Sequence, residues 1–189
     1  LLDKKYPFPI DYLKTETENC KKILSEFIEL LKKNKSINAV KQENNESYYY
    51  PRLHTEINGI INWDWNIDET ERFIRAFSFP YPGAFSYYKE EKVHILSSKI
   101  ELNSNCFHPF ANGRIVTVLD DKSVRVVAGG RSLIIDRISV NNEEMLPGDF
   151  LEIKHSLSSP LDEKQKALTH IPSTLSMNIN ETKYKDLKK

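Results

Sequence analysis

The chain has 189 residues, and its 27 lysines and arginines balance 27 aspartates and glutamates, so the formal net charge is zero. This balance excludes a net positive electrostatic field that attracts nucleic acid or anionic lipid to the whole molecule. The length allows one or two domains with ordinary cores. No apolar run approaches the roughly 20 residues that cross a membrane. The two cysteines are far apart in the sequence, so we expect a reduced, cytoplasmic protein without a disulfide framework.

Residues 1–38 have the pattern of one strand and one helix. Apolar residues alternate in "YPFPI", whose prolines restrict an extended segment to a sheet edge. Thr15 and Glu18 resemble a capping box that begins a helix, and an apolar stripe follows at helical spacing, formed by Ile23, Leu24, Phe27, Ile28 and Leu31. One strand and one helix cannot bury this stripe, so we interpret residues 1–38 as the end of a domain whose remainder lies upstream.

Residues 39–66 are polar and then aromatic, without a sustained period, which is typical of a linker or a functional loop. Their tyrosines and tryptophans predict a segment held against a surface. Arg52, beside Pro51 and three tyrosines, is a candidate substrate-binding residue. Trp63 either stacks on a base or sugar or clamps the linker to the next domain, and the clamp is favoured because buried rings usually pack.

Asn66 predicts the start of a short helix over 67–77, with Glu69 completing a capping box. The stretch "FPYPGA" ends this helix, because its prolines remove backbone donors and its glycine permits a turn. Arg75 lies within an otherwise apolar turn of the helix. Its guanidinium either bonds neighbouring carbonyl groups or contacts a substrate.

From residue 84 the pattern is that of short strands joined by tight turns, expected at 89–91, 120–122 and 129–130. A further short strand is expected after Pro147 and Gly148. Five or six such strands entered by one helix predict a closed or nearly closed, OB-like antiparallel β-barrel, which places the chain in the α+β class. Residues 156–189 are polar and aperiodic, and they predict a wrapping or partly disordered tail.

The segments "YYYPRL", "INGIINWDW" and "ERFIRAFSFPYPGAFSYY", followed by the predicted barrel, resemble the carboxyl-terminal region of the folate-dependent formyltransferases in order and spacing. That family includes methionyl-tRNA formyltransferase and the enzymes that formylate amino sugars on nucleotide carriers. The resemblance implies that residues 1–38 are the last strand and helix of a Rossmann-like catalytic domain, 39–66 a linker and 67–155 the C-terminal domain. It implies 10-formyltetrahydrofolate as the cofactor of the full-length enzyme, and no cofactor is expected in this chain.

The residues that carry formyl transfer in this family have no match in the sequence. The resemblance places the catalytic asparagine, histidine and aspartate upstream of Leu1, and His108 lies between predicted strands, in the wrong place for the catalytic histidine. We therefore expect no catalytic residue here and keep His108 as a candidate substrate contact. The five histidines have no metal-like spacing and no cysteine pair beside them, so no metal site is expected.

The charge pattern bears on the formyl acceptor. Residues 84–155 contain nine lysines and arginines and ten aspartates and glutamates, whereas a tRNA-binding domain is expected to present a basic face. The balance favours a small amino substrate, such as a nucleotide-linked amino sugar. Two alternatives stay open: the tRNA-binding domain of a methionyl-tRNA formyltransferase, and a non-catalytic β-barrel that serves binding or homodimer contact.

Overall fold

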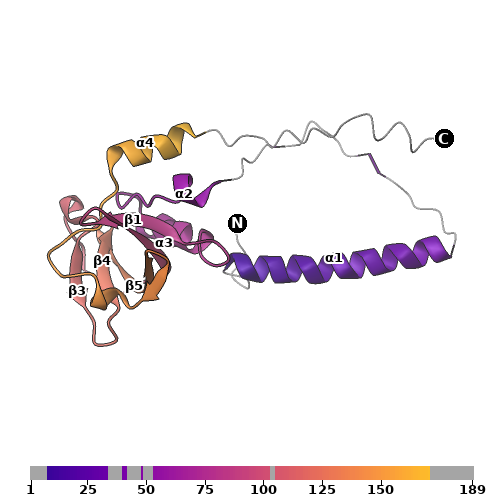
Figure 1. Cartoon of the computed structure of the whole chain (residues 1–189), viewed down its shortest axis with the longest axis horizontal. Helices are drawn as coiled ribbons and strands as arrows, with labels where there is room; N and C mark the ends of the chain where they lie inside the picture. Colours follow the sequence, from indigo (N-terminus) through magenta and orange to yellow (C-terminus); the bar gives the residue numbers. More distant parts are fainter. Residues whose placement is uncertain (1–7, 34–39, 42–47, 49–52, 103–104, 171–189) are drawn as a thin grey trace.

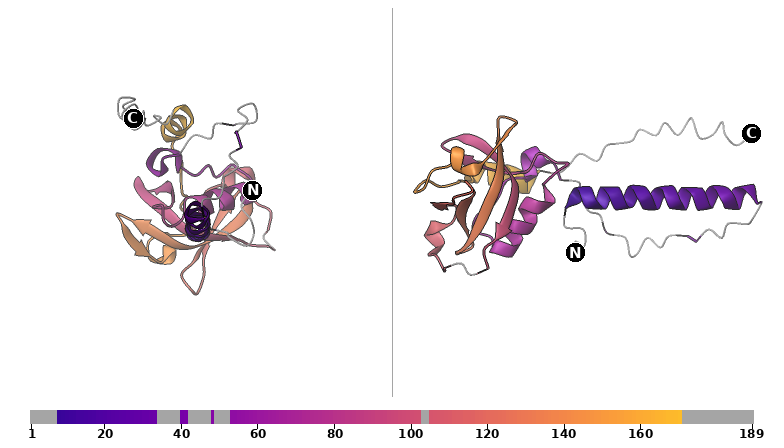
Figure 2. Two further views of the ribbon diagram at one scale, coloured as in Figure 1. Left: turned by 90° about the vertical axis from the view of Figure 1, so that its right-hand side faces the viewer. Right: turned by 90° about the horizontal axis from the view of Figure 1, so that it is seen from below.

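The computed structural model describes residues 8–33, 40–41, 48, 53–102 and 105–170. A small antiparallel sheet with short helices around it forms one end of the molecule, and the long helix α1 (Pro9–Lys32) projects from it (Figure 1). The two further views in Figure 2 show the same projection from other sides. Among the described residues, no helix combines the length and the apolar character that a membrane span requires.

The start of α1 corrects the prediction of an extended segment in "YPFPI". The helix begins at Pro9, and the Phe8 N–H donates to the carboxylate of Asp11 at 3.3 Å. Proline is well suited to the first helical position, since its fixed φ is already helical and its missing donor has no partner there. The capping box predicted at Thr15 is wrong for the same reason, because this residue lies inside the helix and donates to the Asp11 carbonyl at 2.9 Å. Residues 1–7 lie outside the described part of the chain.

The predicted apolar stripe of α1 is present on the helix but is not covered. No residue of α1 is buried. Ile23 and Leu24 are 65% and 58% exposed, and Phe27 is 42% exposed. Within the described residues this long helix therefore has no partner for most of its apolar face.

All strand pairs in the sheet are antiparallel, and the order is β1-β2-β5-β4-β3, with β6 paired to β5. The strands are β1 (Ala84–Tyr88), β2 (Glu91–Ile100), β3 (Ile115–Val118), β4 (Val124–Ala128), β5 (Arg131–Val140) and β6 (Glu143–Met145). Three hairpins turn through residue pairs at positive φ, which are Lys89-Glu90, Gly129-Gly130 and Asn141-Asn142. Positive φ at both positions is what a type I′ hairpin requires. The turns predicted at 89–91 and 129–130 are confirmed.

The strands do not close into the predicted barrel. β1 and β3 stand at the two ends of the strand order and do not pair with each other. Instead, the segment after η3 (Pro147–Asp149) runs between them, forming single bridges from Ser158 to Tyr87 and from Ser156 to Arg114. Residues 154–158 take up hydrogen-bonding groups that direct pairing of β1 with β3 would need, since they bond Tyr87 on one side and Gly113 and Ile115 on the other. The α+β class and the antiparallel sheet are confirmed, and the closed barrel is wrong.

The core lies between the sheet and α3 (Ile67–Ala76), which packs mainly on β2. The predicted cap of this helix is confirmed, because Asn66 Oδ1 accepts from the Glu69 N–H at 2.8 Å. Ile67 and Ile74 of α3 are buried against apolar side chains of the sheet, among them Val93, Ile95, Ile115, Leu133 and Ile135. The strand predicted after Pro147 is wrong, since a 3₁₀ turn occupies that position.

Two short helices complete the fold on one side of β1, where Figure 1 shows them one above the other. α2 (Thr55–Asn58) and α4 (Leu161–Thr169) are in contact. Asn58 Nδ2 donates to the Ala167 carbonyl at 3.0 Å. The first part of the segment predicted as a tail, up to residue 170, therefore lies against the domain.

Candidate functional site

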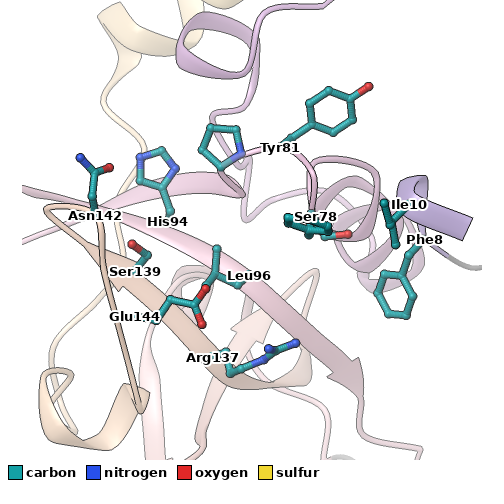
Figure 3. A pocket seen from close by; sticks show the side chains of 12 residues that line it. Phe8, Ile10, Ser78, Tyr81, His94, Leu96, Arg137, Ser139, Asn142 and Glu144 are labelled. Atoms are coloured by element: carbon teal, nitrogen blue, oxygen red, sulfur yellow. The ribbon is translucent and has the colours of Figure 1, made fainter. Parts of the chain in front are cut away.

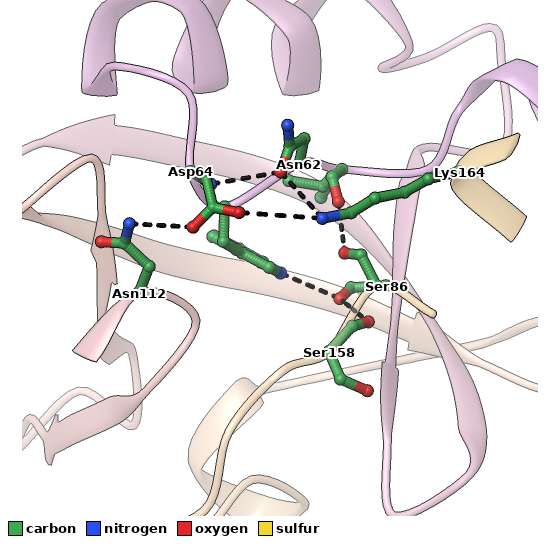
Figure 4. Close-up of polar contacts among 9 residues, drawn as sticks. Asn62, Asp64, Ser86, Asn112, Ser158 and Lys164 are labelled. Carbon is green, nitrogen blue, oxygen red and sulfur yellow. Dashed lines mark hydrogen bonds and ion pairs between the residues drawn. The ribbon is translucent and has the colours of Figure 1, made fainter. Parts of the chain in front are cut away.

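The motif "INWDW" is held in place by hydrogen bonds from several elements (Figure 4). Trp63 is 4% exposed, and its Nε1–H donates to Ser86 Oγ on β1 at 3.0 Å. The Ser86 hydroxyl in turn donates to the Ser158 carbonyl at 2.7 Å. Trp63 therefore packs in the core as a clamp, and its ring is not available for stacking on a ligand in this conformation.

Next to Trp63, the polar side chains of the motif also bond one another and their neighbours. Asn112 Nδ2 donates to Asp64 Oδ1 at 3.1 Å, and Asn112 Oδ1 accepts from the Gly130 N–H at 3.0 Å. Lys164 Nζ donates to Asn62 Oδ1 at 2.9 Å and lies 3.9 Å from Asp64 Oδ2. This network joins residues 62–64, the glycine turn and α4, so its role is to hold these segments together.

The other predicted site residues lie apart from Trp63 and from one another. Arg75 forms a two-point ion pair with Glu71 one turn earlier on α3, with N···O distances of 3.0 and 3.2 Å. His108 is exposed in the loop before η2 (Pro109–Ala111), where its Nδ1 accepts from the Phe110 N–H at 3.3 Å. Arg52 lies outside the described residues. The structure therefore does not bring Trp63, Arg75 and His108 into one site.

A pocket of about 400 Å³ lies elsewhere, on the outer face of β2, β5 and β6 (Figure 3). The turn after α3 and the start of α1 form its other walls. The strands place side chains there by alternation, since Val93 and Ile95 are buried in the core while His94 and Leu96 face outward. His94 is directly opposite Ser139 in the β2–β5 register, so both lie on the pocket face.

The pocket has an apolar side and a polar side. Its apolar side is made by Phe8, Ile10, Phe79, Tyr81 and Leu96. Its polar side is made by His94, Arg137, Ser139, Asn142 and Glu144. An apolar lining with a few convergent polar groups is typical of small-molecule sites, and the volume is within their usual range of about 300–1,000 Å³.

The ring of His94 has a fixed orientation in this pocket. Its Nδ1 lies 3.1 Å from the Gly83 carbonyl oxygen, and because a carbonyl only accepts, Nδ1 carries the proton. Arg137 differs from the other arginines described above. It is exposed, and within the described residues its guanidinium has no hydrogen bond or ion pair. Alternation along each strand predicts which of these side chains face outward, whereas nothing local in the sequence predicts the register that brings them together.

Some of the charges of residues 84–155 are paired locally. Four of the nine lysines and arginines in this range form ion pairs, which are Lys89–Glu152, Lys92–Glu56, Lys122–Asp149 and Arg125–Glu101. Arg125 binds the Glu101 carboxylate through Nε at 2.8 Å and Nη2 at 2.5 Å, and Ser132 donates to the same carboxylate at 2.5 Å. These hydrogen bonds lower the pKa of Glu101. Among the described residues, no group of three or more histidine, cysteine, aspartate or glutamate side chains is arranged to hold a metal ion.

Known proteins with similar sequences and structures point to one family. The sequence profile of the formyl transferase C-terminal domain matches residues 54–154. The bifunctional polymyxin resistance protein ArnA of Wigglesworthia glossinidia brevipalpis is 34% identical over 82 residues, which cover 43% of this chain and 12% of ArnA. The chain thus spans about an eighth of this curated relative.

Crystal structures of HypX from Aquifex aeolicus share the fold. One variant has a TM-score of 0.53 at 17% identity, over 82% of this chain and 26% of HypX. The complex of HypX with tetrahydrofolic acid has a TM-score of 0.50 at 13% identity, over 72% of this chain and 26% of HypX. The profile match covers more than half of the 189 residues and confirms the resemblance drawn from the motifs. This chain belongs to the formyl transferase C-terminal domain family.

Proposed function

We propose that this chain is the C-terminal portion of a cytoplasmic, 10-formyltetrahydrofolate-dependent formyltransferase that acts on an amino group. The family match over residues 54–154 carries the proposal, and the likeness to the HypX complex with tetrahydrofolic acid supports it. The catalytic asparagine, histidine and aspartate that the resemblance implies have no match here. The chain therefore contributes binding and support, while formyl transfer and folate binding belong to the rest of the enzyme.

The exposed stripe of α1 supports the domain organisation within this proposal. Burying an apolar side chain of this size contributes about 1.5–3 kcal/mol, so a stripe that includes Ile23, Leu24 and Phe27, at 42–65% exposure, is costly to leave in water. We propose that α1 is the last helix of a catalytic domain and that its stripe packs on the remainder of that domain. Residues 39–66 are then the linker to the C-terminal domain.

The acceptor that we favour is a small amino substrate, such as a nucleotide-linked amino sugar. A tRNA-binding face is built from free arginines and lysines that neutralise phosphates. The nine cations of residues 84–155 are matched by ten carboxylates, four of the cations are paired, and Arg125 donates two hydrogen bonds to Glu101. The methionyl-tRNA acceptor and the non-catalytic binding or homodimer module are the alternatives.

A formyl-transfer assay on the complete polypeptide that contains this chain tests the proposal. We expect release of tetrahydrofolate from 10-formyltetrahydrofolate with a nucleotide-linked amino sugar, no release with methionyl-tRNA, and no turnover by the 189-residue chain alone. Turnover with methionyl-tRNA would show that methionyl-tRNA, and not a small amino substrate, is the acceptor. If the complete polypeptide formylates no amine, the non-catalytic module becomes the better assignment.

A further inference from the structure

We propose that the pocket on the outer face of β2, β5 and β6 binds a small molecule that carries a phosphate or carboxylate next to an apolar or aromatic group. Arg137 is the anion contact in this proposal. The inference concerns a binding site, and it does not depend on formyl transfer or on the identity of the formyl acceptor.

The position of Arg137 is the first argument. Figure 3 shows its side chain extending from the sheet toward the side of the pocket where Phe8 and Ile10 lie. Arg137 pairs with Ser97, where the β2 register shifts on both sides, and such bulges redirect side chains. An arginine offers five donors in a rigid fork that matches carboxylate and phosphate oxygens. Arg75 and Arg125 have their forks occupied by carboxylates, whereas that of Arg137 is available to a ligand.

The local field of the pocket is mixed, and it leaves Arg137 as the group that attracts an anion. Phe8 and Ile10 line the pocket, so the N-terminal end of the 24-residue helix α1 lies there. The positive end of a helix dipole favours an anion, but it amounts to about half a unit charge, and the carboxylate of Asp11 in the first turn outweighs it. Glu144, which lines the pocket and forms no ion pair within the described residues, also opposes an anion. Removal of its charge is therefore expected to strengthen binding.

The apolar side of the pocket is the second argument, because it indicates what the anion is attached to. Phe8, Phe79 and Tyr81 line it with rings that are 40%, 68% and 43% exposed. Covering such rings with a ligand is favourable, at about 25 cal/mol per Å² of apolar surface. Asn142 and Ser139 add hydrogen-bonding groups on the opposite side. A free anion can bind Arg137 but does not cover the apolar side of the pocket. An anion attached to a ring can bind Arg137 and cover the apolar side together.

An NMR titration of the 189-residue chain with phenyl phosphate, inorganic phosphate and phenol at constant ionic strength tests the inference. We expect phenyl phosphate to shift the Arg137 Nε–H resonance and the ring resonances of Phe79 and Tyr81. Its affinity is expected to exceed that of either fragment by about tenfold or more, since the charge-assisted contact and the ring contact combine. Shifts that are equal for phosphate and phenyl phosphate, or absent from these residues, would overturn it.

Three variants sharpen this experiment. Arg137→Gln is expected to weaken phenyl phosphate binding about tenfold, and Glu144→Gln to strengthen it about threefold. The matched control is Lys99→Gln, which removes an exposed cation from β2 outside the pocket and should leave the affinity unchanged. Equal losses in Arg137→Gln and Lys99→Gln would show only non-specific attraction and would contradict the proposal. The dispersed amide spectrum of the sheet checks that each variant is folded.

Discussion

Trp63 and Ser86 are 23 residues apart in the chain and are joined by a hydrogen bond from the indole Nε1 to the serine Oγ at 3.0 Å. The bond fixes the "INWDW" motif on the first strand of the sheet, in a region where Trp63 is 4% exposed. Because the serine hydroxyl also donates to the Ser158 carbonyl, one side chain connects three segments. We expect this connection to contribute to the stability of the whole domain.

Replacing Trp63 with phenylalanine keeps a ring but removes the indole donor. We expect the free energy of unfolding to fall by about 1–3 kcal/mol, from the lost hydrogen bond and the poorer fit of the smaller ring. Urea denaturation followed by circular dichroism measures the change. Trp65→Phe is the control, since Trp65 is half-buried and its ring meets that of Phe73 edge-on at 4.9 Å, with no hydrogen bond from its indole within the described residues. Equal losses in the two variants would contradict the role assigned to the indole donor.

The two glycines between β4 and β5 should differ in their tolerance of alanine. Gly129 has φ +53, and an added Cβ would lie 2.5 Å from the Trp65 carbonyl oxygen. Gly130 has φ +74, but the nearest atom to its added Cβ is 3.2 Å away. Both variants meet left-handed strain of about 1–2 kcal/mol, and Gly129→Ala adds a backbone clash. We expect Gly129→Ala to lower the unfolding free energy clearly more than Gly130→Ala, and the reverse order would refute the close approach of the Trp65 backbone.

Glu101 should make the stability of the domain depend on pH. Hydrogen bonds from Arg125 and Ser132 lower its pKa from the ordinary value of 4.5. A carboxylate with a lowered pKa in the folded state stabilises that state above the ordinary value, and this contribution is lost as the pH falls through the folded-state pKa. We therefore expect Glu101→Gln to lower the unfolding temperature at pH 7 and to narrow its difference from the wild type below pH 4.5.

Differential scanning calorimetry between pH 7 and pH 3 measures this effect. Glu91→Gln is the matched control, because Glu91 is an exposed carboxylate at the start of β2 and should not change the slope. If the deficit of Glu101→Gln stays constant across the range, the ion pair with Arg125 is not the source of the dependence.

The segment that runs between the two edges of the sheet is expected to contribute to the stability of the domain through Leu157. Its side chain is 2% exposed, and its N–H donates to the Gly113 carbonyl at 2.8 Å. We expect Leu157→Ala to cost about 2–5 kcal/mol, as for other buried leucines. Leu161→Ala, four residues later on α4 and 79% exposed, should cost less than about 0.5 kcal/mol. Chemical denaturation of the two variants decides whether this segment belongs to the folded domain.

Features with local causes could be predicted from the sequence. Asn66 caps α3 because its side chain reaches a backbone group three residues away, and the Gly129-Gly130 turn follows from the φ angles that two glycines allow. The start of α1 is also local, but two local patterns competed there. The alternation in "YPFPI" favoured a strand, and the suitability of Pro9 for a first helical turn prevailed.

Features with distant causes could not be predicted. The pocket depends on the register that pairs His94 with Ser139 and on the shift beside Ser97, and one residue of slip would place these side chains on the other face. The open sheet likewise depends on residues 156–158, whose polar sequence gave no sign of pairing with Tyr87 and Arg114. The role of Arg75 could not be predicted for a different reason. On a helix, a carboxylate one turn away can pair with an arginine, and Glu71 pairs with Arg75 in this way.

The bridge between Ser86 and Ser158 spans 72 residues of chain, which has a consequence for folding during synthesis. A ribosome releases the strands in order, and residues 59–61 can cover the start of the β1 edge at Phe85. The edge at Tyr87 and the residue before β3, Arg114, gain their partners only when residues 156–158 have emerged. Exposed strand edges are templates for pairing with other chains. The segment that completes the domain is thus also the one that ends the period in which a nascent chain is open to aggregation.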